Sequence, residues 1–346
     1  MSSLVDHTRE LRFTHSQEVW VTTDLELHQG QAVTLHAQGQ VDMGLPMPAS
    51  PSLFLWARIG VDGEIFNVSS EAHTFVADRD GELFLAVRSA GINWMDRRGS
   101  YAPDFGGVPR YPIDAQVQVF VWAVAPDIAL SAMAATGESR WIRAMGNYRS
   151  VPQLPEGFEY LWHLGQSTVF EAFADDERVG VRGMPSNDAG IIRKPLDIPL
   201  DESTALSFDW LYRQLPAKGP ETEARYHDYL SIALEFDNGQ DLTWFWSGHL
   251  EPGTEFTCPL PGWNQIETHV ALQSGEEGLG EWHSHRRPVL RDYESAVGGE
   301  LPRRIVAVWF INSGVFGDKP GEAVFANVQV HTGSRVIGVF PSADAQ

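Results

Sequence analysis

The sequence YLSIALEF (residues 229–236), DNGQ (237–240) and LTWFW (242–246) decides the fold of this chain. The first and third segments are short and rich in apolar and aromatic residues, as strands are, and the segment between them carries the Asn-Gly pair of a tight hairpin turn. Side chains alternate between the two faces of a strand, so the two tryptophans of LTWFW share one face and its phenylalanine lies on the other. We therefore predict an antiparallel hairpin here.

Short segments of this kind, separated by turn residues, recur along the whole chain, which is typical of sandwiches and barrels. We predict an all-β protein of two jelly-roll-like β-sandwich domains, at residues 1–126 and 158–346, joined by a linker at 127–157. The expected strands are 32–37, 52–60, 73–77, 82–88 and 116–124 in the first domain, and 158–164, 168–174, 179–182, 205–212, 229–236, 242–246, 267–273, 305–311 and 323–330 in the second.

One segment departs from the strand pattern. Residues 287–297 (RPVLRDYESAV) have a proline near their start, carry apolar residues at helical spacing and are followed by two glycines. Proline favours the first turn of a helix and glycine its end. We predict a single helix near residues 287–298.

The chain is strongly acidic, with a formal net charge of −21 over 346 residues. Such a surface repels phosphate backbones and anionic lipids, so we expect no nucleic-acid partner and no membrane partner. The first residues, MSSLVDHTRELRF, lack the basic and apolar regions of a secretory signal, and the single cysteine has no partner for an internal disulfide. We therefore expect a cytoplasmic protein in which Cys258 is a small buried residue.

The N-terminal part carries the segments GQAVTLHAQG (30–39), WARIG (56–60), TFVA (74–77) and GELFLAV (81–87). With these it resembles the galactose-binding lectins of the bacterial PA-I type. The resemblance implies a sandwich whose last long loop, in that family, holds a calcium ion that binds galactose. The loop here contains Asn93, Asp96 and Asp104 but also three arginines, and calcium needs several oxygen ligands and negative charges. We expect this loop to have lost the ion site.

The C-terminal part, about residues 206–330, carries the segments FDW (208–210), HDY (227–229), LEFD (234–237), THVALQSG (268–275), LGEW (279–282), RRPVLRDY (286–293) and PRRIVAV (302–308). With these it resembles a bacterial family known as DUF3047, whose function is unknown. The resemblance implies a jelly-roll-like sandwich and transfers no catalytic residue.

Histidines are concentrated in this C-terminal part. Five of the 12 lie between residues 227 and 285, at His227, His249, His269, His283 and His285. Residues two apart on a strand share a face, so Glu267 lies beside His269 and Glu281 beside His283. Three interpretations stay open: acid–base chemistry, since imidazole titrates near neutral pH; metal binding, since a His-x-His pair presents two nitrogens to one point; and an ordinary polar surface.

A second group combines aspartate, tyrosine and arginine with one of these histidines. Such a mixture suits a lyase or isomerase that abstracts a proton and holds an anionic intermediate. The alternative is that Asp209 and Asp228 hold the edge of the sandwich. The predicted catalytic set is Asp209, Tyr212, Arg213, His227, Asp228, His249, His269 and His283.

Tryptophans form a third group. An aromatic floor stacks on sugars or encloses an apolar ligand, and the alternative for any one tryptophan is core packing between the sheets. The predicted ligand-binding set is Trp162, Trp244, Trp246, Trp263 and Trp282.

Two functions from different classes follow. The favoured one is a binding protein for a carbohydrate or similar small molecule, and the alternative is a lyase, isomerase or hydrolase that uses the catalytic set. The sequence has no phosphate-binding loop, no GxGxxG segment, no nucleophile elbow and no cysteine pair, so we predict no cofactor and no metal. The enzyme hypothesis requires its residues to converge on one cleft.

Overall fold

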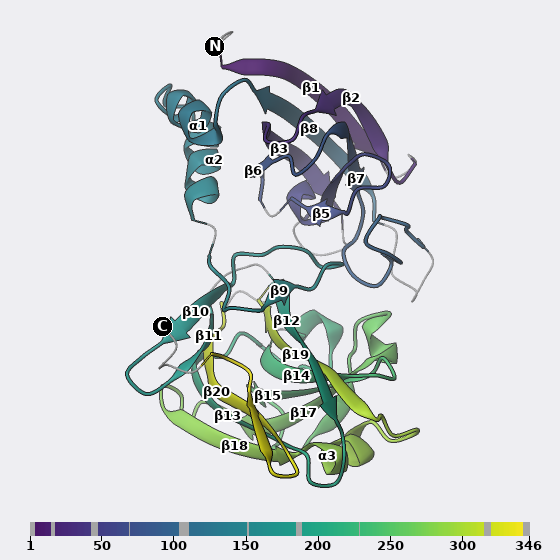
Figure 1. The fold of residues 1–346 in the computed structure, drawn as a ribbon, viewed down its shortest axis with the longest axis vertical. Coiled ribbons are helices and arrows are strands. Elements are labelled where there is room, and N and C mark those ends of the chain that lie inside the picture. Colours follow the sequence, from purple (N-terminus) through teal and green to yellow (C-terminus); the bar gives the residue numbers. More distant parts are fainter. Residues whose placement is uncertain are drawn as a thin grey trace. The chain divides into compact units, whose positions relative to one another are not determined.

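The computed structural model describes residues 4–14, 18–42, 48–68, 70–103, 111–150, 152–184, 189–227, 229–314 and 320–341. The chain divides into two units, and each is built around its own pair of β-sheets (Figure 1). Unit 1 comprises Met1–Val151 and Trp162–Gln166, and unit 2 comprises Pro152–Leu161 and Ser167–Gln346. The predicted β-sandwich fold class is confirmed.

The strands of unit 1 are β1 (Val5–Thr14), β2 (Val21–Leu27), β3 (Ala32–Val41), β4 (Leu55–Ile59), β5 (Phe66–Asn67), β6 (Ala72–Val76), β7 (Gly81–Val87) and β8 (Ile113–Trp122). They form two four-stranded sheets with the orders β1-β8-β3-β6 and β2-β7-β4-β5. Alternate residues of both sheets point inward, so Leu35, Leu85 and Val119 are fully buried in one core.

Two helices follow where the sequence predicts a linker. They are α1 (Pro126–Ala134) and α2 (Ser139–Arg149), and both belong to unit 1. Trp141 of α2 is fully buried and meets Trp122 of β8 and His36 of β3 edge to face. The structure differs from the predicted linker because both helices bury an apolar side against the sheet.

The strands of unit 2 are β9 (Glu159–Tyr160), β10 (Phe170–Ala174), β11 (Val179–Gly183), β12 (Ala189–Pro199), β13 (Ala205–Gln214), β14 (Leu230–Phe236), β15 (Asp241–Ser247), β16 (Glu255–Thr257), β17 (Glu267–Ser274), β18 (Trp282–Pro288), β19 (Arg304–Ser313), β20 (Glu322–Thr332) and β21 (Arg335–Gly338). A six-stranded sheet has the order β10-β11-β20-β13-β18, with β21 paired to β20. A seven-stranded sheet has the order β16-β17-β15-β14-β19-β12-β9, and one apolar core joins the two sheets.

The predicted hairpin forms β14 and β15, which pair antiparallel. Its turn uses Gly239 at a φ of +80°, a conformation that glycine adopts without strain. Trp244 and Trp246 point into the core between the sheets, and Phe245 points to the opposite side. We call that opposite side of the seven-stranded sheet its outer face.

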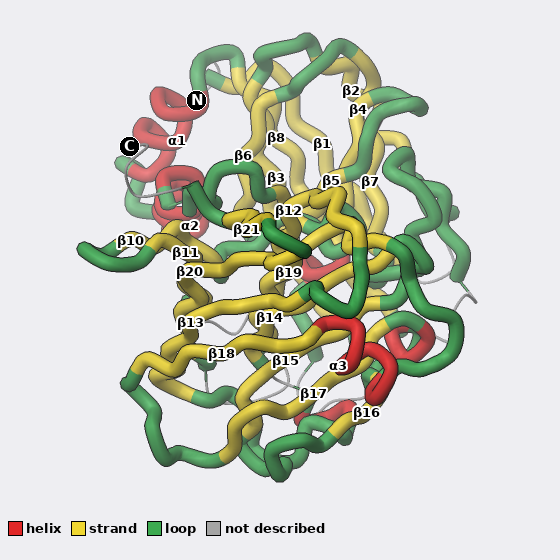
Figure 2. Tube along the Cα trace, turned by 60° about the horizontal axis from the view of Figure 1, so that its bottom comes forward, coloured by secondary structure: helices red, strands yellow, loops and turns green. Residues whose placement is uncertain are grey.

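The predicted helix is α3 (Val289–Ala296), which follows β18 directly (Figure 2). The buried Asp292 accepts a hydrogen bond from Trp244 Nε1 at 3.0 Å and two from the Arg287 guanidinium at 2.7 and 2.8 Å. These charge-assisted bonds fix the helix to both sheets. Within the described ranges, no helix is both long and apolar enough to span a membrane.

Replacing Asp292 by Ala is expected to lower the free energy of unfolding of unit 2 by about 3 kcal/mol, because the Trp244 N–H and the Arg287 guanidinium then lack their acceptor. Urea denaturation measures the change. Glu294→Ala, on the exposed side of the same helix, is the control and is expected to stay within about 0.5 kcal/mol of the unmodified chain. Equal effects of the two substitutions would contradict the anchoring role.

Acid is expected to destabilise unit 1 through His36. Burial, with the nearby charges of Arg140 and Arg143, lowers the pKa of His36 from 6.5 to about 4. In the unfolded chain His36 binds a proton below about pH 6.5, whereas in the folded chain it does so only below about pH 4. The free energy of unfolding therefore falls as the pH falls from about 6.5 to about 4. The single group accounts for about 2 kcal/mol between pH 7 and pH 5.

Denaturation of the His36→Gln variant at both pH values checks this contribution. The variant is expected to lose less stability between pH 7 and pH 5 than the unmodified chain does. His28→Gln, at an exposed position, is the control for the loss of a histidine side chain. An unchanged pH dependence in His36→Gln would show that another group is responsible.

Candidate functional site

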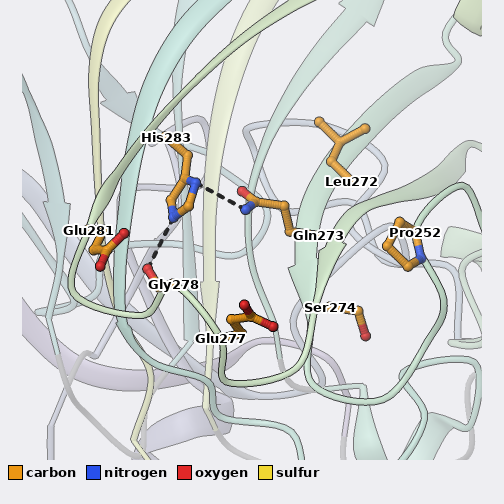
Figure 3. A pocket seen from close by; sticks show the side chains of 8 residues that line it. All are labelled: Pro252, Leu272, Gln273, Ser274, Glu277, Gly278, Glu281 and His283. Atoms are coloured by element: carbon orange, nitrogen blue, oxygen red, sulfur yellow. Dashed lines mark hydrogen bonds between the residues drawn. The ribbon is translucent and has the colours of Figure 1, made fainter.

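A pocket of about 490 Å³ opens in unit 2 between the end of β17 and the start of β18 (Figure 3). Its walls come from the β15–β16 connection, the last residues of β17, the β17–β18 connection and β18 itself. The lining residues are Pro252, Leu272, Gln273, Ser274, Glu277, Gly278, Glu281 and His283. A volume in this range is typical of small-molecule sites.

Hydrogen bonds within the protein fix one wall of this pocket. Gln273 Oε1 accepts from Trp210 Nε1 at 2.6 Å and lies 3.1 Å from His285 Nε2, and its amide nitrogen lies 3.2 Å from His283 Nδ1. His283 Nε2 lies 3.0 Å from the carbonyl oxygen of Gly278 (Figure 3). Every contact is satisfied if both imidazoles are neutral with the proton on Nε2. Burial supports this state at His285, where it lowers the pKa to about 4.

The lining on the side of Gly278 is acidic. The side chains of Glu277 and Glu281 are exposed, and neither makes a hydrogen bond or an ion pair with the residues that the structure describes. Figure 3 shows both carboxylates on the side of Gly278, across from Pro252 and Leu272. The pocket therefore combines free acceptors with a small apolar wall.

A second polar cluster lies buried at the outer face of the seven-stranded sheet. Glu267 and His269 are two apart on β17, Cys258 directly follows β16, and His227 lies between β13 and β14. The potential ligand atoms of these four residues lie within 4.8 Å of one another. Each residue is 3% exposed or less. We call this group the buried quartet.

Three predicted site residues lie instead on the outer side of the six-stranded sheet. Asp209 accepts from the Ser284 hydroxyl at 2.6 Å and from the Asn327 amide at 2.9 Å. Arg213 Nε lies 3.4 Å from Glu322 Oε1. The guanidinium carbon of Arg178 lies over the ring of Trp282, 4.6 Å from the ring centroid. These residues use their polar groups in contacts within the sheet, as the alternative interpretation of Asp209 expects.

Several predicted residues belong to the core. Tyr212 is fully buried, donates to the carbonyl of Leu230 at 2.6 Å, and burial raises its pKa well above 10. Trp244 and Trp246 are also buried, and their N–H groups donate to Asp292 and to the carbonyl of Gly275. The prediction of an aromatic ligand floor is wrong for these two tryptophans, since even-numbered positions of β15 face the opposite sheet.

The other predicted residues lie apart from one another. Trp162 belongs to unit 1, in an aromatic cluster with Trp56 and Trp94. His249 is exposed after β15, Trp263 is half-buried in a short 3-10 helix, and Asp228 lies outside the described residues. Of the described members of the predicted catalytic set, only His227 and His269 are brought together, and His283 alone lines the pocket. The described members of this set therefore share no single cleft.

Some residues of both sites are not predicted from the sequence. Cys258 is predicted only as a small buried residue, and neither Gln273 nor Glu277 is among the predicted site residues. The pairing of Glu267 with His269 was predicted from their spacing, but the approach of Cys258 and His227 depends on two long connections. Such non-local contacts have no signal in a single sequence.

The described part of the PA-I-like loop uses its polar groups internally. Asn93 is buried and donates to the carbonyl of Ala102 at 2.7 Å, and Asp96 accepts from the Ser100 hydroxyl at 2.5 Å. Asp104 lies outside the described residues. The resemblance to these lectins stays a prediction.

Residues 160–329 match the model of DUF3047, described as a protein of unknown function. The predicted resemblance of the C-terminal part to this family is thereby confirmed. The match covers most of unit 2 and brings no reaction with it. No curated protein matches the chain.

Solved structures with similar folds include the xyloglucanase domain of NopAA, a type three effector from Sinorhizobium fredii, in complex with cellobiose (8% identity, 52% of this chain, 95% of that chain, TM-score 0.32). Another is the native family 12 xyloglucanase from Bacillus licheniformis (10% identity, 52% of this chain, 95% of that chain, TM-score 0.31). A third is the family 11 carbohydrate-binding module of cellulosomal cellulase Lic26A-Cel5E of Clostridium thermocellum (14% identity, 54% of this chain, 86% of that chain, TM-score 0.25). At these identities and TM-scores the similarity concerns the β-sandwich fold alone.

Gln273→Ala is expected to lower the free energy of unfolding of unit 2 by roughly 2 kcal/mol, because Trp210 Nε1 loses its acceptor inside the sandwich. Urea denaturation is the measurement. Gln265→Ala removes the same side chain from an exposed position and is expected to cost less than about 0.5 kcal/mol. If Gln273→Ala is equally mild, the wall of the pocket is not held by this network.

Proposed function

We propose that the protein binds a carbohydrate, or a similar hydroxyl-rich small molecule, in the pocket between β17 and β18. The observation that carries the proposal is the pair of exposed carboxylates, Glu277 and Glu281, beside a wall that the Gln273 network holds in place. A site that is ordered before the ligand arrives avoids part of the entropic cost of binding.

The lining suits sugar hydroxyls. Carboxylates accept hydrogen bonds from hydroxyl groups, and such charge-assisted bonds are stronger than neutral ones. The hydroxyl of Ser274 supplies a donor, and Pro252 with Leu272 offers apolar surface to the C–H groups of a sugar ring. Because a sugar carries both kinds of surface, this mixed lining favours it over a purely apolar ligand.

Electrostatics limit the ligand class further. The two carboxylates and the net charge of −21 both repel an anion, so sugar acids and phosphorylated sugars are disfavoured. A neutral saccharide meets no such barrier. An amine is the competing occupant, since it would be attracted by the same carboxylates.

Calorimetric titration of the full chain with glucose, galactose, xylose and their disaccharides tests the proposal. At least one neutral saccharide is expected to bind, and Glu277→Gln and Glu281→Gln are each expected to weaken it by about tenfold or more, since each replaces a charged acceptor. Glu276→Gln is the matched control, because Glu276 is exposed in the same connection but does not line the pocket.

Putrescine and citrate, as a cation and an anion, complete the panel. Binding of putrescine alone, weakened by the same two substitutions, would replace the carbohydrate with an amine ligand. Equal weakening of saccharide binding by Glu276→Gln would mean that the pocket is not the site.

A further inference from the structure

We propose that the buried quartet, His227, Cys258, Glu267 and His269, is a binding site for a divalent transition-metal ion, with zinc as the best fit. The site lies at the outer face of the seven-stranded sheet and shares no residue with the pocket. The proposal is independent of carbohydrate binding.

Two pairs of donors in the quartet have the spacing of a tetrahedral site, and all four donor atoms lie within 4.8 Å of one another. Cys258 Sγ lies 3.4 Å from His227 Nε2, and His269 Nε2 lies 3.7 Å from Glu267 Oε2. Bond lengths of 2.0–2.3 Å around zinc give a tetrahedron with edges of about 3.3–3.8 Å. These two donor pairs therefore have the separation that adjacent ligands of one ion require.

The hydrogen bonds around the quartet direct lone pairs toward its centre. His227 Nδ1 lies 3.1 Å from the carbonyl oxygen of Glu221, to which it donates when protonated, and this leaves the lone pair on Nε2. Tyr229 donates its hydroxyl to Glu267 Oε1 at 2.8 Å, while Oε2 faces His269. Supporting contacts of this kind, to a carbonyl group and from a hydroxyl, are typical around metal ligands.

One polar atom in the quartet lacks a hydrogen bond. His269 is 1% exposed, and its Nε2 has no hydrogen-bond partner among the residues that the structure describes. Leaving a buried polar atom unpaired costs free energy, and native proteins rarely do so without a function. A metal ion at the centre of the quartet would satisfy this nitrogen.

Charge also suits a divalent ion. Thiols and carboxyl groups bind a metal ion in their deprotonated forms, and imidazole binds it in its neutral form. With a divalent cation bound, Cys258 would be a thiolate and Glu267 a carboxylate. The thiolate and carboxylate would then balance its two positive charges inside the protein.

The donor set selects the metal. One sulfur, two imidazole nitrogens and one carboxylate oxygen are ligands of zinc, whereas calcium and magnesium need mainly oxygen donors. All four donors are enclosed, and four protein ligands fill a tetrahedral site. The ion would therefore have a structural role, joining the His227 segment and the end of β16 to β17.

Elemental analysis of untagged full-length protein, dialysed without chelator, is the direct test. The unmodified chain is expected to contain about one zinc ion per chain, and the double variant Cys258→Ala/His269→Gln less than about a tenth of that. His249→Ala, an exposed histidine of the same unit, is the control and is expected to keep the full content. Equal zinc content in the double variant and the unmodified chain would overturn the proposal.

A titration of the unmodified chain keeps the test valid if the double variant does not fold. After removal of metal with a chelator, added zinc is expected to raise the unfolding temperature at a ratio of one ion per chain, and magnesium and calcium are expected to leave it unchanged. Added cobalt is expected to produce the charge-transfer absorption of a sulfur–metal bond. No temperature shift with zinc and no such absorption with cobalt would contradict the proposed site.

Discussion

The structure of unit 2 depends on how the polar outer face of the seven-stranded sheet is kept from water. Asp241, Thr243, Glu267 and His269 project from β15 and β17 on this face, yet each is 3% exposed or less. Burying such groups costs free energy unless each finds a partner. Glu221 supplies one set of contacts, since its carboxylate accepts from the Ser247 hydroxyl and the Gly248 N–H at 2.6 and 2.9 Å. The Thr243 hydroxyl donates to Asp241 at 3.2 Å, and the proposed metal would supply a partner for His269 through the buried quartet.

The two sites of unit 2 differ in their exposure to solvent. The pocket opens at the ends of β17 and β18, where Glu277 and Glu281 meet solvent. The buried quartet lies where Cys258 and His227 cover the sheet, and its thiol and imidazoles are buried from solvent. One strand, β17, thus carries residues of a closed site near its start and of an open site at its end.

The sequence predicts the elements of the fold that depend on residues close together in the chain. The hairpin of β14 and β15 follows from alternation and the Asn-Gly turn, and the helix α3 follows from its proline, its apolar spacing and its terminal glycines. β1 was missed because most of its side chains are exposed and show no alternation. The sites were predicted less well, because the contact of Cys258 with His227 joins residues that are 31 apart, lie in connections and are separated by the three strands β14, β15 and β16. The tryptophans of β15 were assigned to a ligand floor because a sequence does not show which face of a strand is inward.

Anomalous diffraction at the zinc absorption edge, from crystals of the untagged chain, is the most direct test of the metal site. One strong peak is expected inside unit 2, about 2.0–2.3 Å from His227 Nε2, Cys258 Sγ, Glu267 Oε2 and His269 Nε2. A map with no peak at this position, in which the Cys258 thiol donates to His227 Nε2 and a water molecule satisfies His269, would contradict it.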